Sequence, residues 1–356
     1  MRTPTLVSAR QGARRGRARQ CLLAVMVGLL WLAGCSDAGP PAPSSVPQPA
    51  PEASASASGA EGGYAPVDAD TRLVDVVNHP AFGRFGRFLV PNGGGLPDDG
   101  RTLRDVGDLL PYHSHVDVGT SVDVVNALIA AVDRGQPVFH DIYADAARAA
   151  DPSRQDTGLF YFEGEPGAPF AIISAGGGFS YVGSLHESLP HALELSRRGY
   201  HAFALQYRTG GLQVAAEDLA AALSYVFAHA DEFGLDTSGY SLWGGSAGAR
   251  MAATLGARGP AAFGGDPLPR PAAVIMQYTG YTDVSGQDPP TYACVGEDDG
   301  IANWRTMQRR VDALSAAGVP TEFHRYPNLG HGFGLGIGTS AEGWIDSAVA
   351  FWEQHR

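Results

Sequence analysis

The stretch SLWGGSAGARM runs from Ser241 to Met251 and places three glycines around a single serine, Ser246. Each glycine costs backbone entropy on folding, so such a cluster needs a structural reason. Two interpretations are open. The stretch is a flexible loop, or it is a turn so tight that no side chain can be admitted beside the serine. The rest of the sequence decides between them.

The composition is that of a folded and acidic protein. The chain has 356 residues, of which 44% are hydrophobic and 17% are charged, so it can form a buried core and does not resemble a disordered protein. Its formal net charge is −12, and it contains arginine but no lysine. Nucleic-acid binding needs a basic surface, so this balance argues against a nucleic-acid partner.

Residues 1–34 have the organisation of a secretory signal peptide. Arginines precede an apolar run, Cys21–Ala33, that is shorter than a membrane-spanning helix. The run ends in LAGC, Leu32–Cys35, which resembles the lipobox of bacterial lipoproteins. This resemblance implies cleavage before Cys35 and attachment of a diacylglycerol to its sulfur. An ordinary cleaved signal peptide with an incidental cysteine is the alternative.

Residues 35–63 form a Pro/Ala/Ser-rich segment of low complexity, which predicts an extended tether between the lipid and a folded domain. We therefore expect an extracytoplasmic protein of the bacterial cell envelope, with the membrane as its attachment surface. Once Cys21 is removed and Cys35 is acylated, only Cys294 remains, so no internal disulfide is expected. The apolar neighbours of Cys294 indicate a buried structural thiol.

From Asp156 onward, short apolar runs alternate with amphipathic helical patterns. The expected strands are 158–162, 169–174, 200–207, 240–243, 272–278, 291–295 and 321–326, and the expected helices are 186–198, 212–233, 303–317, 341–355 and one that opens at 247. This alternation implies right-handed crossovers and a mostly parallel central sheet flanked by helices on both faces. The predicted fold class is α/β, with the main domain over 157–356.

Residues 64–156 are interpreted as an N-terminal extension that packs on this domain and covers part of its pocket. The segment 82–100 predicts a strand and a loop, and 121–135 predicts a helix that ends at a glycine. A third feature of the extension is the sequence YHSHVD (112–117), which contains three side chains with the spacing of a metal-binding motif: His113, His115 and Asp117. No partner cluster appears elsewhere, so we interpret it as a polar loop and expect no metal.

The expected sheet supplies a reason for the glycines around Ser246. The serine follows the strand 240–243 and precedes a helix, in a G-x-S-x-G turn that is typical of a nucleophile elbow. Such a turn projects the hydroxyl from the sheet, and the helix directs its N-terminal amides toward the reaction centre. A glycine-rich loop without chemistry is the alternative.

A serine nucleophile needs a base, and the base needs a carboxylate to orient it. In enzymes with this elbow, the acid follows a late strand and the histidine comes after it. Asp298 and Asp299 both follow the strand 291–295, and His331 lies in a loop after the strand 321–326. Each residue alone has a structural explanation, such as a helix cap or a solvated loop, but together they predict a catalytic triad.

The loop ISAGGGF follows the strand 169–174, which is the place of an oxyanion hole in such enzymes. Acyl transfer builds negative charge on a carbonyl oxygen, which preorganised backbone amides stabilise. We predict that these amides belong to Gly177, Gly178 and Ala247. Tyr207 and Arg208 end a central strand and are expected to brace it.

These segments together resemble serine esterases of the α/β-hydrolase fold, and in particular the carboxylesterase, acetyl-esterase and BD-FAE-like group. The resemblance rests on AGGGF (175–179), GYHAFALQYR (199–208), GGSAGA (244–249), GEDD (296–299) and HGF (331–333). It covers about residues 157–356 and implies Ser246 as nucleophile, His331 as base and Asp299 as acid, with Asp298 as the other candidate.

The resemblance also implies an acyl-enzyme mechanism without cofactor or metal, on small esters with short or sugar-linked acyl groups. Phe179 is the last residue of the oxyanion loop, and His186 and Glu187 follow the loop closely enough that all three are candidates to line a substrate pocket. The sequence departs from the family at Ala175, where many relatives have a histidine that supports the loop. A serine peptidase of the same fold and a non-catalytic envelope lipoprotein are the alternative functions.

Overall fold

The computed structural model describes residues 63–356, which belong to one compact unit. The predicted signal peptide 1–34, the predicted lipidation site Cys35 and all of the predicted linker but its last residue lie outside the described residues. Within 63–356, no helix combines the length and the apolar character needed to cross a membrane.

An eight-stranded sheet forms the centre of this unit, in the order β1-β2-β4-β3-β5-β6-β7-β8. Its strands are β1 (Phe139–His140), β2 (Gly158–Phe162), β3 (Pro169–Ser174), β4 (His201–Gln206), β5 (Asp236–Gly245), β6 (Ala273–Gln277), β7 (Thr291–Gly296) and β8 (Thr321–Tyr326). Strand β2 pairs antiparallel with β1 and β4, and the other neighbouring pairs are parallel. The predicted mostly parallel sheet is confirmed.

Burial explains why these residues form strands. Every residue of β3, β6 and β7 is buried, as expected for strands covered on both faces, whereas the edge strand β8 is only partly buried. Cys294 lies in β7 as a buried free thiol, and its burial raises its pKa. The central strands therefore lie in the core, and the loops that carry the predicted site residues follow their carboxyl ends.

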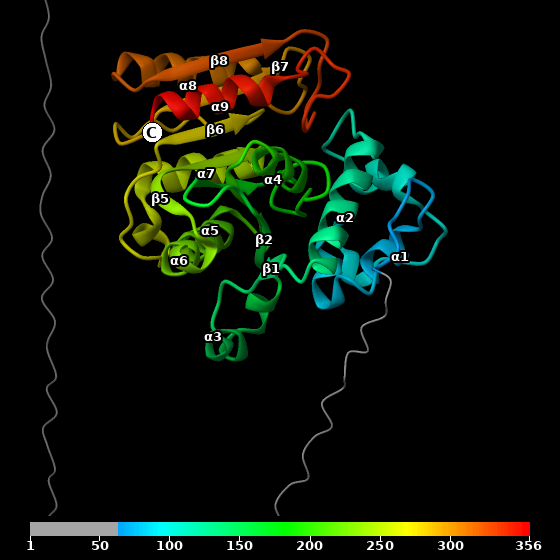
Figure 1. Cartoon of the computed structure of the whole chain (residues 1–356). Coiled ribbons are helices and arrows are strands. Elements are labelled where there is room, and N and C mark those ends of the chain that lie inside the picture. Colours follow the sequence, from blue (N-terminus) through cyan, green and yellow to red (C-terminus); the bar gives the residue numbers. More distant parts are fainter. Residues whose placement is uncertain (1–62) are drawn as a thin grey trace, which may run out of the picture. The chain divides into compact units, whose positions relative to one another are not determined.

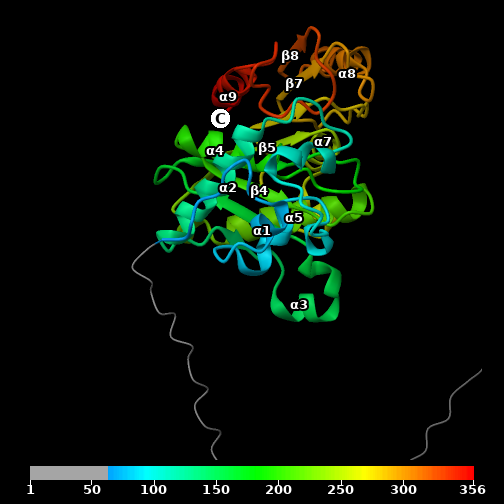
Figure 2. The ribbon, with the colours of Figure 1, turned by 90° about the vertical axis from the view of Figure 1, so that its right-hand side faces the viewer.

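Helices cover both faces of the sheet (Figure 1). The α-helices are α1 (Leu73–Val77), α2 (Val118–Asp133), α3 (Asp145–Ala150), α4 (Ser188–Arg197), α5 (Leu212–Ala228), α6 (Ala230–Phe233), α7 (Ala247–Arg258), α8 (Trp304–Ala316) and α9 (Trp344–Gln354). Figure 2 shows α4 and α9 on one side of the strands and α7 and α8 on the other. The ring of His191 in α4 contacts that of Trp344 in α9, with centroids 5.4 Å apart.

The N-terminal part shares the core of the sheet. Val67 and Leu73 belong to the same buried cluster as Trp352 of α9, and α2 packs against α4. The helix predicted over 121–135 is α2, which begins three residues earlier because Asp117 caps it by accepting the Thr120 N–H.

The prediction of a strand within 82–100 is wrong. Residues Gly83–Phe88 form a 3-10 helix, in which side chains three residues apart lie on one face. Phe85 and Phe88 are three apart, and both rings stack on Phe139 of β1 with centroids 5.4 Å away. The 3-10 spacing therefore allows both rings to pack on the edge of the sheet.

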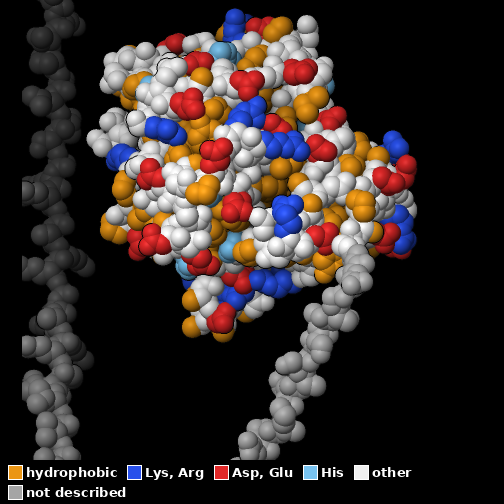
Figure 3. Space-filling model, viewed as in Figure 1, with side chains coloured by type: hydrophobic (Ala, Val, Ile, Leu, Met, Phe, Trp, Pro, Cys, Tyr) orange, Lys and Arg blue, Asp and Glu red, His pale blue; other side chains and the backbone are white. Residues whose placement is uncertain are grey.

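Exposed charged side chains contribute little to the stability of the fold. On the face that Figure 3 presents, arginines lie among acidic side chains. Exposed ion pairs of the chain include Arg104 with Asp70 at 2.7 Å and Arg72 with Asp98 at 3.0 Å. Exposed pairs contribute at most about 1 kcal/mol each, so the fold depends mainly on its core.

Candidate active site

Ser246 lies in the turn between β5 and α7, with backbone angles of φ 51° and ψ −111° that serine rarely adopts. A β-carbon on Gly248 would lie 1.9 Å from the Ser174 carbonyl oxygen, and one on Gly244 would lie 2.3 Å from the carbonyl carbon of Gly248. Helix α7 therefore approaches the strands too closely for a side chain at either position. The glycines are required by a tight turn and not by a flexible loop.

Three side chains meet beyond the carboxyl ends of the strands. The Ser246 Oγ lies 3.0 Å from His331 Nε2, and His331 Nδ1 lies 2.7 Å from Asp299 Oδ2. The other oxygen of Asp299 accepts hydrogen bonds from the N–H groups of Ile301 and Ala302, at 2.8 and 2.6 Å. Because a carboxylate oxygen accepts hydrogen bonds, Nδ1 is the donor in this contact, and Nε2 is the ring nitrogen that faces the serine hydroxyl.

The two acidic candidates have different environments. The side chains of Asp299 and His331 are 0% and 6% exposed, whereas Asp298 is an exposed residue. The structure thus brings Ser246, His331 and Asp299 together and leaves Asp298 at the surface.

The predicted oxyanion loop follows β3, and Gly178 and Ala247 line the same cleft as Ser246. Within residues 63–356, no protein acceptor takes a hydrogen bond from the N–H groups of Gly177, Gly178 or Ala247. Ala247 is also the first residue of α7, where the helix dipole favours negative charge. The hydroxyl of Tyr207 donates to the Ala175 carbonyl at 2.9 Å and braces the start of the loop.

A cleft of about 410 Å³ opens beside Ser246. It is lined by Gly178, Phe179, Ala247, Arg250, Thr279, Gly280, Tyr281, Thr282 and Asp283. The Arg250 guanidinium lies over the Tyr281 ring, 5.9 Å from its centroid. The cleft therefore combines apolar, hydroxyl and charged groups next to the serine, and Phe179 lies where the sequence predicts it.

His186 and Glu187 do not line this cleft, which corrects the prediction from their position in the sequence. The two residues are 5% and 0% exposed. His186 Nε2 donates to the Gly332 carbonyl at 2.8 Å, and Glu187 accepts from the Gly176 N–H and the Tyr278 hydroxyl. Hydrogen bonds to neighbouring loops therefore turn both side chains inward.

The H-x-H-x-D residues are separated in the structure. His113 Nε2 lies 2.8 Å from a Glu187 oxygen, His115 is exposed, and Asp117 caps α2. In the part of the chain that the structure describes, no three His, Cys, Asp or Glu side chains are arranged to hold a metal ion.

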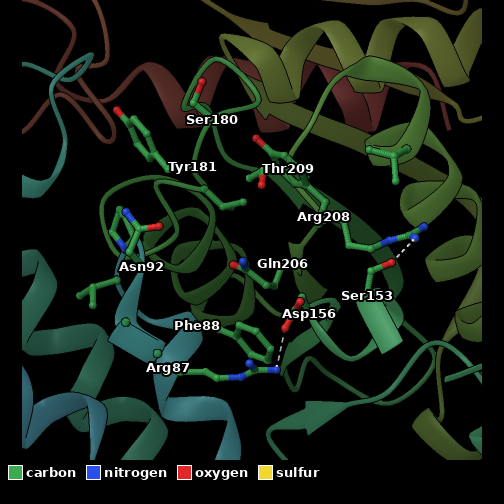
Figure 4. A pocket seen from close by; sticks show the side chains of 17 residues that line it. Arg87, Phe88, Asn92, Ser153, Asp156, Ser180, Tyr181, Gln206, Arg208 and Thr209 are labelled. Carbon is green, nitrogen blue, oxygen red and sulfur yellow. Dashed lines mark hydrogen bonds and ion pairs between the residues drawn. The ribbon is translucent and has the colours of Figure 1, made fainter. Parts of the chain in front are cut away.

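A second pocket, of about 380 Å³, lies between the N-terminal part, Tyr181 and the end of β4 (Figure 4). Its two arginines already have acidic partners. Arg87 pairs with Asp156 at 3.0 Å, and Arg208 pairs with the buried Asp218 at 2.8 Å. We therefore interpret these two ion pairs as structural contacts that stabilise the end of β4 and the N-terminal extension.

Comparison with known proteins shows similarity to α/β-hydrolases. Residues 163–266 match the BD-FAE family model. An α/β-hydrolase enzyme from a Medee basin deep-sea metagenome library superposes with a TM-score of 0.50 at 23% identity, covering 56% of this chain and 92% of the other. An acetyl ester-xyloside bifunctional hydrolase from Caldicellulosiruptor lactoaceticus gives 0.50 at 21% identity, covering 60% and 96%. A search of curated proteins found no significant match.

The fold is therefore the α/β-hydrolase fold, as the sequence predicts. The BD-FAE match covers residues 163–266, which is less than half of the chain. The matched segment contains the oxyanion loop and Ser246, whereas Asp299, His331 and residues 64–156 lie outside it.

Sequence reasoning missed the contact of His113 with Glu187 and the presence of Arg250 in the cleft. Helical spacing could have located Arg250, because it follows Ser246 by about one turn and so lies on the same side of α7. No local signal joins His113 to Glu187, because their contact depends on how two distant loops pack.

The burial of His186 predicts a specific pH dependence of stability. Burial lowers its pKa from 6.5 to about 4. Between pH 6.5 and about pH 4, the His186 imidazole is therefore protonated in the unfolded chain but neutral in the folded chain. The free energy of unfolding falls as the pH is lowered through this range. His186→Gln keeps an N–H donor but does not titrate, so its unfolding curve should lose this component, about 3 kcal/mol in size. Urea unfolding of wild type and variant from pH 7.5 to 4 measures the free energy of unfolding of each. The same dependence on pH in both proteins would contradict the prediction.

Proposed function

We propose that this chain is a serine carboxylic-ester hydrolase that acts on short or sugar-linked acyl groups. The observation that carries the proposal is the series of contacts from Ser246 through His331 to Asp299, beside three amides without protein acceptors. The cleft of about 410 Å³ supports a small substrate, and its hydroxyl and charged groups suit a hydroxylated alcohol.

The proposed reaction has two steps, in which Ser246 is first acylated and then deacylated. His331 removes the proton of Ser246, whose Oγ attacks the ester carbonyl. The amides of Gly177, Gly178 and Ala247 stabilise the tetrahedral oxyanion. The protonated His331, oriented by its carboxylate partner, then gives its proton to the alcohol as the ester bond breaks, which leaves an acyl group on Ser246. In the second step, His331 takes a proton from water, which attacks the acyl carbonyl, and the acid is released as Ser246 recovers its proton. No cofactor takes part.

The proposal extends to the location of the enzyme. The basic region, the apolar run and the LAGC sequence support export and lipidation at Cys35. A lipidated cysteine followed by a Pro/Ala/Ser-rich segment would hold the folded domain at the membrane surface of the cell envelope, with small-molecule esters as its substrates.

The first prediction concerns the serine. The full-length chain should hydrolyse p-nitrophenyl esters, with the highest kcat/KM at acetate to butyrate, because the cleft is small. Ser246→Ala should lower kcat by roughly 10⁴- to 10⁶-fold, because the variant lacks the nucleophile. A fluorophosphonate should label wild type at Ser246 and leave the variant unlabelled, as read by mass spectrometry.

Other outcomes would redirect the proposal. A rate that peaks at dodecanoate would contradict a preference for short acyl groups. A folded wild type that cleaves peptides but no ester would indicate a peptidase, and one that also escapes the fluorophosphonate would indicate a non-catalytic protein.

The two neighbouring aspartates provide a matched test of the acid. Asp299→Asn should lower kcat by about 10⁴-fold near neutral pH, because an amide permits the wrong tautomer of His331. Asp298→Asn changes a side chain at the surface and should leave kcat within about threefold of wild type. Steady-state kinetics of both variants on one ester decides, and equal losses would argue against this assignment.

Lipidation has its own control in the sequence. Cys35→Ser should abolish incorporation of a labelled fatty acid and release the protein from the membrane fraction. Cys21→Ser should change neither, because Cys21 lies in the segment that is predicted to be cleaved. Incorporation of the labelled fatty acid into the Cys35→Ser variant would show that the lipid is attached at another residue.

A further inference from the structure

Residues 112–114 of the N-terminal extension lie across the active site. Ser114 donates two hydrogen bonds to the carbonyl oxygen of His331, from its backbone N–H at 3.0 Å and from its hydroxyl at 2.6 Å. The Tyr112 ring lies against Gly178, where a β-carbon would be 3.2 Å from the ring. These three residues, the strap, therefore contact both the histidine loop and the oxyanion loop.

Glu187 lies in the interior beside the oxyanion loop and accepts three hydrogen bonds. The donors are the Gly176 N–H, the Tyr278 hydroxyl at 2.9 Å and Nε2 of His113 at 2.8 Å. The side chains of Glu187 and His113 are 1% and 2% exposed. Burial alone raises the pKa of Glu187, but His113 and the Gly176 amide together lower it to about 2, so the carboxylate is ionised at neutral pH.

His113 is itself oriented by the neighbouring chain. Its Nδ1 lies 2.9 Å from the Tyr181 hydroxyl, whose oxygen accepts the Tyr112 N–H at 3.2 Å. Because a carboxylate oxygen accepts hydrogen bonds, Nε2 of His113 is the donor to Glu187. A continuous series of hydrogen bonds thus runs from the strap to Glu187 and on to the Gly176 amide.

The Glu187 carboxylate also packs against the turn that carries the nucleophile. A β-carbon on Gly245 would lie 2.6 Å from one of its oxygens, and one on Gly176 would lie 2.9 Å from the β-carbon of the nucleophilic serine. Tyr278, which the carboxylate holds, packs its ring on that of His331 with centroids 4.9 Å apart. A displaced carboxylate would therefore disturb both the oxyanion loop and the surroundings of the base.

We propose that His113 and Glu187 are a buried positioning pair for the proposed ester hydrolysis, and that the strap is a working part of the active site. This inference rests on the proposed function. The pair holds the loop with Gly177 and Gly178 in the geometry that the tetrahedral oxyanion needs. Its effect falls on the transition state more than on substrate binding, because neither side chain lines the cleft.

Loss of His113 would leave the buried charge of Glu187 with fewer donors in an interior that excludes water. Such a carboxylate is costly, so it takes up a proton or turns toward other donors. The Gly176 amide would lose its anchor in either case, and the amides that follow it would shift.

The test compares His113→Leu with His115→Leu in the full-length chain. Both histidines belong to the H-x-H motif, but His115 is exposed, with its ring 3.1 Å from Ser114 Oγ. His113→Gln is the conservative variant, because its amide can place an N–H donor near the original position of Nε2. Tyr181→Phe removes one oxygen from the series of hydrogen bonds without opening a large cavity.

Three quantities separate positioning from folding: kcat and KM for p-nitrophenyl acetate, Ki for phenylboronic acid, which forms a tetrahedral adduct on the serine, and the fraction of sites titrated by a fluorophosphonate. His113→Leu should lower kcat and boronic-acid affinity in parallel, by about 10²- to 10³-fold, with little change in KM. His113→Gln should recover much of this loss, and His115→Leu should match wild type.

Tyr181→Phe should give a smaller loss of the same kind. Combined with His113→Leu it should add nothing, because both changes act through one series of hydrogen bonds. If His113→Leu fails to fold, Tyr181→Phe and His113→Gln carry the test.

The inference is overturned, with the proposed function intact, if the folded variants keep wild-type kcat per titrated site. A loss confined to KM overturns it equally, because positioning of the oxyanion loop acts on kcat. A wild type inert to esters and to the fluorophosphonate overturns the proposed function, and the positioning pair falls with it.

Discussion

The close approach of helix α7 to strand β3 is the constraint on which the rest of the site depends. Gly248 lies so near the Ser174 carbonyl that a methyl group cannot be admitted, and the chain turns sharply enough to give Ser246 a φ of 51°. The strained residue is held by its surroundings, since its N–H donates to the Gln277 carbonyl of β6 at 3.0 Å. The direction of the hydroxyl, and the place that His331 must reach, follow from this turn.

Much of the α/β domain could be predicted because its signals are local. β3 and β8 occupy the residues expected from their β-rich runs, and α7 begins at Ala247 as expected. Parallel strands end at one edge of the sheet, so topology alone predicts that loops after different strands meet there. That rule is the reason why Ser246, His331 and an acidic residue after β7 could be grouped from the sequence.

Distant contacts account for what the sequence could not predict. Glu187 follows the oxyanion loop and looks like a pocket residue, yet Tyr278, 91 positions away, turns it inward with a hydrogen bond. His186 is held in the same way by Gly332, 146 positions away. Phe85 lies in a 3-10 helix, and its ring stacks on that of Phe139 in β1. In each case the deciding partner is remote, and a local pattern carries no information about it.

The bond from Ser114 to the carbonyl of His331 joins residues 217 positions apart. Closing so long a loop costs more conformational entropy than closing a short one. A chain still emerging from the ribosome holds its serine and its glycine loop long before it holds its histidine. The three side chains can therefore come together only after residue 331 has been synthesised, so the site cannot form on the early part of the chain alone.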